Sequence, residues 1–237
     1  MEIHGILFDK DGTLIDFSAT WVPVLKALAI EFANGHQPTA AELLAIAGYD
    51  AERDTIRAGS IWAGGTSREL AAAWRPGMPA DEVDALTAAV DRFCQAHGPL
   101  SAVPLAELRP LFEALRADGL KLGIATNDSE RTARVTAKNL GVDDMFELIL
   151  GYDSVVNPKP AADMVHAFCA VTGLAPETIA VVGDNVHDIE MARAAGAGLA
   201  IGVLSGNSSH EDLAPHADHV IDSVADLPRL LIHIRGG

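Results

Sequence analysis

The chain of 237 residues is 49% hydrophobic and 21% charged, and its formal net charge at pH 7 is −16. This length and composition predict a folded protein with one large domain, or a core domain with a smaller one, rather than a disordered chain. The acidic excess argues against nucleic acid and anionic membranes as partners, because both require a basic surface.

The predicted strands lie in two separate parts of the chain. The apolar run IHGILFD at 3–9 predicts a central strand, and further strands are predicted at 121–126, 146–151, 179–184, 198–203 and 219–221. Helical patterns, most of them closed by glycine, alternate with the later strands. This alternation predicts the α/β class, with a mainly parallel sheet flanked by helices on both faces.

Residues 17–103 differ from the rest of the chain. Four helical patterns begin there, at Ser18, Thr39, Thr66 and Ala80, and no strand-like run separates them. We therefore predict an inserted all-helical cap at 17–103 and a core formed by 1–16 and 104–237. The cap would lie over the carboxyl edge of the sheet, where open α/β sheets bind their ligands.

Two aspartates, Asp9 and Asp11, follow the first predicted strand, and Gly12 allows the chain to turn after them. Alternate residues of an extended chain share a face, so both carboxylates can face one site while Lys10 points away. The ordinary alternative is a turn, since Asp and Gly are common turn residues. Carboxylates this close repel each other unless positive charge lies nearby.

Polar residues also follow three later strands. Thr126 and Asn127 precede a helix, where hydroxyl and N–H groups can hold a phosphate or simply cap the helix. Lys159 lies between two prolines that stiffen its backbone, although a lone lysine is commonly a solvated surface charge. Asp184 ends a strand, and Asp188 follows about one helical turn later. Carboxylates without accompanying His or Cys favour Mg²⁺ over Zn²⁺.

Four short segments together resemble the four motifs of the haloacid dehalogenase superfamily. They are DKDGTL, the AT that ends at Thr126 together with Asn127, KP, and GDNVHD. They stand in the same order and at the corresponding strand ends. The resemblance covers the core and implies a Rossmann-like fold. The position of the insertion resembles a C1-type helical cap, as in members similar to phosphoglycolate phosphatase.

The resemblance implies a Mg²⁺-dependent phosphatase of small phosphate monoesters, either phosphoglycolate-like compounds or sugar phosphates. Asp9 would be the nucleophile that forms an aspartyl-phosphate, and Asp11 would be the general acid and base. The residues implied to bind the phosphoryl group are Thr126, Asn127 and Lys159. Those implied to hold the metal are Asp9, Asp184 and the backbone carbonyl of Asp11, with Asp188 in support.

Other activities stay open beside this one. A phosphomutase of the β-phosphoglucomutase kind shares the same motifs and cap class, and a non-catalytic regulatory protein could share the fold. The presence of Asp11 argues against the dehalogenase branch of the superfamily, which lacks a second aspartate. Lys10 stands where many phosphatase members carry an apolar residue, and the sequence assigns it no role.

The cap segment at 53–70 contains Arg53, Arg57 and Arg68 around Trp62. This segment could be a substrate-specificity loop in which an arginine meets a substrate carboxylate, or it could be a helix–loop–helix with solvated charges. The expected partner is a small phosphorylated metabolite, and the sequence leaves the choice between monomer and homodimer open.

The two cysteines, Cys94 and Cys169, lie in separate helical segments without metal-ligand spacing. We expect both to be reduced thiols. Together with the lack of a secretory pattern and of a long apolar window, this predicts a cytoplasmic protein.

Overall fold

The structure, a computed structural model, describes residues 2–236. Its main sheet has six strands in the order β5-β4-β1-β6-β7-β8, and every neighbouring pair is parallel. The strands are β1 (Gly5–Phe8), β4 (Lys121–Ala125), β5 (Leu148–Leu150), β6 (Ile179–Gly183), β7 (Leu199–Val203) and β8 (His219–Ile221). All six predicted strands and their parallel arrangement are therefore confirmed.

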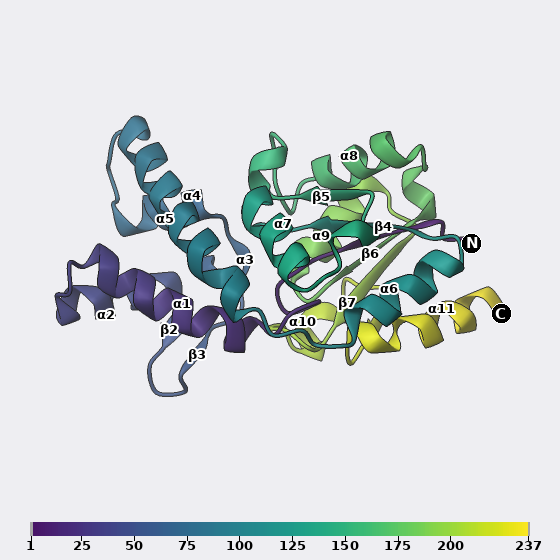
Figure 1. The fold of residues 1–237 in the computed structure, drawn as a ribbon, viewed down its shortest axis with the longest axis horizontal. Helices are drawn as coiled ribbons and strands as arrows, with labels where there is room; N and C mark the ends of the chain where they lie inside the picture. Colours follow the sequence, from purple (N-terminus) through teal and green to yellow (C-terminus); the bar gives the residue numbers. More distant parts are fainter. Residues whose placement is uncertain (1, 237) are drawn as a thin grey trace.

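Strand alternation explains why helices cover both faces of this sheet (Figure 1). In β1, Ile6 and Phe8 enter one buried cluster while Leu7 enters the other. The first cluster includes side chains from α6 (Leu108–Ala117), α7 (Glu130–Asn139) and α11 (Leu227–Gly236). The second includes side chains from α8 (Asp163–Thr172), α9 (Val186–Ala195) and α10 (His210–Leu213). The α/β fold class is confirmed.

Short 3₁₀ turns join these elements, namely η1 (Asp143–Met145), η2 (Tyr152–Ser154), η3 (Pro176–Thr178) and η4 (Val224–Asp226). Within residues 2–236, no helix combines the length and the apolar character that crossing a bilayer requires.

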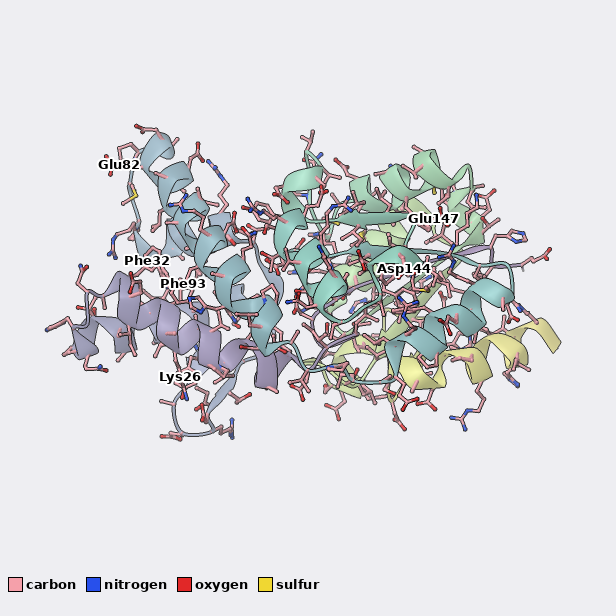
Figure 2. The ribbon with its side chains drawn as sticks, in the orientation of Figure 1. Lys26, Phe32, Glu82, Phe93, Asp144 and Glu147 are labelled. Carbon is pink, nitrogen blue, oxygen red and sulfur yellow. The ribbon has the colours of Figure 1, made fainter. Side chains whose placement is uncertain are left out.

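The inserted segment forms a lobe of its own beside the sheet (Figure 1). It contains α1 (Phe17–Phe32), α2 (Gln37–Ala47), α3 (Ile61–Gly64), α4 (Ser67–Trp74) and α5 (Ala80–Ser101). Its buried cluster, which includes Leu25, Leu28 and Leu70, is drawn entirely from the insertion. The half-buried Phe32 and Phe93, labelled in Figure 2, pack against this cluster, and α5 lies beside α7 of the core. A separate apolar core supports the proposed division of the chain at 17–103.

The insertion departs from the all-helical expectation at one place. Two short strands, β2 (Tyr49–Asp50) and β3 (Thr55–Ile56), pair in antiparallel fashion around a turn. The Asp50 carboxylate accepts N–H bonds from Glu52 and Arg53, and Asp54 adopts a φ of 51°. Strands of two residues have no periodicity to detect, so a sequence pattern cannot reveal them.

Candidate active site

One pocket at the carboxyl edge of the sheet is lined by every predicted site residue, which are Asp9, Asp11, Thr126, Asn127, Lys159, Asp184 and Asp188. Asp9 follows β1 directly, and its N–H donates to the Val182 carbonyl of β6 at 2.8 Å. Because the sheet is parallel, the ends of β1, β4 and β6 meet at the same edge. Residues of the insertion, including Trp21 and Trp62, complete the pocket wall.

The backbone after Asp11 passes so close to the Asp184 carboxylate that only a glycine fits there. Gly12 has a φ of +82°, a conformation that other residues adopt with strain. A Cβ atom at Gly12 would lie 2.6 Å from Oδ2 of Asp184. The turn predicted after the two aspartates therefore also makes room for a carboxylate 172 positions later in the chain.

Three buried carboxylates form a candidate metal site. Asp9, Asp184 and Asp188 each place an oxygen within 4.8 Å of the others. The N–H of Asn207 donates to Asp184 Oδ2 at 3.0 Å, and the N–H of Asn185 donates to Asp188 Oδ2 at 3.0 Å. These bonds fix the orientation of Asp184 and Asp188 within the cluster. Asp188, predicted only as support, thus joins the cluster itself.

The pKa values of these carboxyls reflect their burial beside one another. Burial raises the pKa of Asp9 to about 7, and the charges of Asp188 and Asp11 add to the increase while Lys159 opposes it. Burial and the neighbouring Asp9 also raise the pKa of Asp184 well above its usual range. A divalent cation would favour the ionised carboxylates and lower both pKa values. Ionised carboxylates are hard oxygen donors, which are the ligands that Mg²⁺ prefers.

Lys159 supplies a fixed positive charge among the acids. Its Nζ lies 2.6 Å from Asp9 Oδ1 and 2.6 Å from Asp188 Oδ1, and the side chain is buried. Burial alone would lower the pKa of Lys159, but the charges of Asp188 and Asp9 outweigh it and raise the pKa. Lys159 is therefore not the solvated surface charge of the alternative interpretation.

Thr126 and Asn127 use their side chains differently. The Thr126 hydroxyl accepts the N–H of Asp128 at 3.1 Å, so its own proton remains available to a ligand. The Asn127 amide nitrogen donates to the carbonyls of Gly64 at 2.8 Å and Lys159 at 3.2 Å. The amide of Asn127 therefore joins the core to the insertion, and its backbone N–H is the better candidate for contacting a phosphate.

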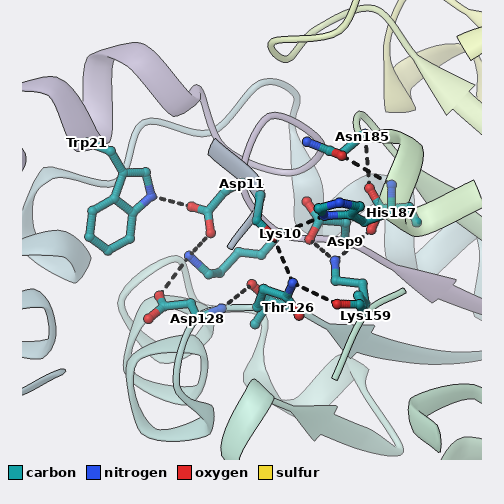
Figure 3. Close-up of polar contacts among 12 residues, drawn as sticks. Asp9, Lys10, Asp11, Trp21, Thr126, Asp128, Lys159, Asn185 and His187 are labelled. Carbon is teal, nitrogen blue, oxygen red and sulfur yellow. Dashed lines mark hydrogen bonds and ion pairs between the residues drawn. The ribbon is translucent and has the colours of Figure 1, made fainter. Parts of the chain in front are cut away.

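Asp11 and Lys10 form a second group of charges, shown in Figure 3. Lys10 Nζ lies 2.5 Å from Asp11 Oδ2 and 3.2 Å from Asp128 Oδ2, and the lysine is 2% exposed. The indole N–H of Trp21, from α1 of the insertion, donates to Asp11 Oδ1. The prediction that Lys10 points away from the acids is wrong, because β1 ends at Phe8 and strand alternation does not extend further.

Burial alone would lower the pKa of Lys10, yet the charges of Asp11 and Asp128 reverse this effect and raise it. The same Lys10 opposes the burial that raises the pKa of Asp128 to about 6. Lys10 also lies over the Trp21 ring, with Nζ 5.0 Å from its centroid. Charge pairing thus explains why a lysine is tolerated at this buried position.

Several contributors to the pocket were not predicted from the sequence, among them Trp21, Asp128 and His187. Gly64 also lines the pocket, and it belongs to the cap segment at 53–70 that the sequence analysis singled out. Trp21 belongs to a helical pattern, and Asp128 precedes a helix where an acid is common. His187 falls inside GDNVHD, and its Nδ1 lies 3.2 Å from the Gly64 carbonyl. Of these residues, only His187 could have been predicted to line the pocket, because it lies in the sequence between Asp184 and Asp188.

Comparison with known proteins adds family relationships to this geometry. Residues 3–196 match the family described as haloacid dehalogenase-like hydrolase. The chain is 28% identical over 235 residues to the N-acetylmuramic acid 6-phosphate phosphatase of Pseudomonas aeruginosa, covering 99% of this chain and 95% of that protein. It is 31% identical over 230 residues to a phosphoglycolate phosphatase of Yersinia pestis, covering 95% and 91%. A β-phosphoglucomutase structure from Clostridium difficile shares the fold, with a TM-score of 0.70 at 15% identity over 99% and 100% of the two chains.

Proposed function

The chain belongs to the haloacid dehalogenase-like hydrolase family, and from this premise we propose that it is a Mg²⁺-dependent phosphatase of small phosphate monoesters. The observation that carries the proposal is the buried contact of Lys159 with Asp9 and Asp188, inside a pocket that the insertion covers. Relatives matched over most of the chain are named as phosphatases. We further propose that 17–103 acts as a cap and that the protein works in the cytoplasm.

The metal would be held by Asp9, Asp184 and Asp188, with the backbone carbonyl of Asp11 as a further ligand. When bound, Mg²⁺ supplies positive charge that offsets the charge on the phosphoryl oxygens. Lys159, the Thr126 hydroxyl and the Asn127 backbone N–H would bind the phosphoryl group on its other sides.

In the first step, a carboxylate oxygen of Asp9 attacks phosphorus, and the bond between phosphorus and the substrate's alcohol oxygen breaks. Asp11 gives its proton to that oxygen, so the leaving group departs as a neutral alcohol. In the second step, a water molecule attacks the aspartyl-phosphate and passes a proton to Asp11. Inorganic phosphate leaves, and the Asp9 carboxylate is regenerated.

Contacts from two different parts of the chain fix the position of the Asp11 carboxyl. Its two oxygens contact Trp21 Nε1, from the insertion, and Lys10 Nζ, from the core. We infer that these contacts position the carboxyl beside the leaving-group oxygen once the insertion has covered the pocket.

Replacing Asp11 with asparagine is expected to lower kcat for an alkyl phosphate by about 10²–10⁴-fold, because the amide cannot transfer the proton. Phosphate release with Mg²⁺ measures this loss, and circular dichroism checks that the variant is folded. Wild-type turnover of an alkyl ester by the variant would contradict the assignment of Asp11.

Removing divalent cations with EDTA is expected to reduce turnover of p-nitrophenyl phosphate to background, since Lys159 alone would then face three buried carboxylates and the phosphoryl group. Excess Mg²⁺ should restore the rate. Full activity in EDTA would overturn the metal assignment.

A sugar phosphate as substrate tests the alternative activity. If the protein converts it to an isomerised sugar phosphate instead of releasing free phosphate, the protein is a phosphomutase.

A further inference from the structure

We propose that this site selects phosphate esters of uncharged alcohols, such as polyols and sugars, over esters that carry a carboxylate next to the ester oxygen. The inference rests on the proposed phosphatase function and narrows its substrate class. It follows from which side chains of the insertion line the pocket and from where the charged side chains of the insertion lie.

The wall that the insertion contributes is mainly apolar and aromatic. Its polar residues are Thr66 and Ser67, and the Thr66 hydroxyl already donates to Glu69 Oε2 at 3.1 Å. Phe17, Ile61, Trp62 and Leu70 line the pocket, and the Trp62 ring meets the Trp21 ring edge-on at a centroid distance of 5.9 Å. Trp62 is half-buried, so the pocket has an aromatic surface against which the C–H groups of a polyol can pack. An anionic group would find no compensating charge on this wall.

The insertion contains six lysines and arginines, and none of them lines the pocket. Lys26 pairs with Asp54 at 2.6 Å, Arg53 lies 3.6 Å from Asp50, and Arg68 pairs with Asp84. The remaining three are Arg57, which donates to the Ala45 carbonyl, Arg75, which donates to the Trp74 carbonyl, and Arg92, which is exposed. The arginines around Trp62 in the sequence therefore lie outside the pocket lining.

The core contributes more negative than positive charge to the same pocket. Five lining carboxylates belong to it, namely Asp9, Asp11, Asp128, Asp184 and Asp188. When Asp11 holds the proton that it transfers as an acid, Lys159, Lys10 and one divalent cation would offset the four remaining charges and leave no positive charge in excess for a second anion. A second anion on the leaving group would lie in this negative field without a partner.

His187 is the remaining basic side chain of the pocket lining among the described residues. Its Nδ1 lies 3.2 Å from the Gly64 carbonyl, so a proton on that nitrogen is directed at the backbone of the insertion. A Cβ atom at Gly64 would lie 3.1 Å from the same Nδ1, which shows how closely the two segments meet. Nδ1 of His187 is thereby directed at the contact between insertion and core.

The test compares the protein's activity on two phosphate esters, 2-phosphoglycolate and 2-hydroxyethyl phosphate. They are alike except that the first has a carboxylate where the second has a hydroxymethyl group. With Mg²⁺ present, kcat/KM for phosphate release is expected to be at least about 10-fold higher for 2-hydroxyethyl phosphate. An equal or higher value for 2-phosphoglycolate would overturn the inference.

A variant with a positive charge added to the part of the pocket wall that the insertion forms tests the role of charge, and a neutral side chain of similar length at the same position is its control. Ala63 lines the pocket from α3, is half-buried and belongs to no part of the proposed catalytic machinery. Ala63→Lys is expected to shift the ratio of the two kcat/KM values towards 2-phosphoglycolate by about 10-fold, whereas Ala63→Met, of similar length, should not. The same shift with methionine, or none with lysine in an active enzyme, would contradict the role of charge.

Activity on p-nitrophenyl phosphate separates this inference from the proposed function. If the protein with Mg²⁺ hydrolyses neither that compound nor any other ester, the proposed phosphatase function fails. If it hydrolyses p-nitrophenyl phosphate but prefers 2-phosphoglycolate, only the inference about the leaving group fails.

Discussion

Replacement of Asp9 by asparagine is expected to reduce phosphate release from p-nitrophenyl phosphate by on the order of 10⁶-fold, as for the loss of other catalytic nucleophiles. The amide has nearly the shape of the carboxylate but lacks the charge needed to attack phosphorus. It also removes one member of the acidic cluster that would hold Mg²⁺. Steady-state phosphate release with Mg²⁺ measures the loss.

Asp143→Asn is a suitable control for the Asp9 variant. Asp143 is an exposed aspartate of η1 that lies outside the pocket lining, so the same chemical change there should leave turnover unaffected. Substantial turnover by Asp9→Asn, with the control active, would show that another group attacks phosphorus.

Replacement of Lys10 by methionine is expected to lower the free energy of unfolding by about 3–5 kcal/mol, because Asp11 and Asp128 would stay buried without their counter-charge. Methionine keeps an unbranched apolar stem, so the effect comes mainly from the lost ammonium group. Urea denaturation followed by circular dichroism measures the change. We also expect kcat to fall, since Asp11 would lose one of the two contacts that position it.

Lys26→Met provides the comparison for Lys10→Met. Lys26 also pairs with an aspartate, Asp54, but its side chain is 37% exposed and that of Asp54 is 64% exposed. Removing an exposed pair typically changes stability by about 0–1 kcal/mol. If the two variants lost equal stability, the charge pairing of Lys10 could not be what stabilises the buried group.

The sequence was sufficient to predict the sheet and the residues at its carboxyl edge. The runs at 5–8, 122–125 and 179–183 are buried at every position, so they are apolar throughout and stand out from the helical patterns. In a parallel sheet the strand ends that follow them share an edge, which brings Asp9, Thr126 and Asp184 together. The C-terminal helix α11 and the β2–β3 pair escaped prediction.

The roles of the remaining side chains depend on contacts between distant segments. Lys10 pairs with Asp128, and Asn127 bonds to Gly64, while strand alternation describes neither pair. The position of Arg57 against the Ala45 carbonyl likewise depends on how the insertion folds.

The sequence by itself thus determined the fold class and the arrival of Asp9, Thr126 and Asp184 at the proposed catalytic edge, because both follow from local hydrophobic patterns and parallel strand geometry. Only the tertiary structure decided which charges neutralise Asp11 and which side chains of the insertion face the substrate. These depend on burial and on pairing across the chain, which no local pattern encodes.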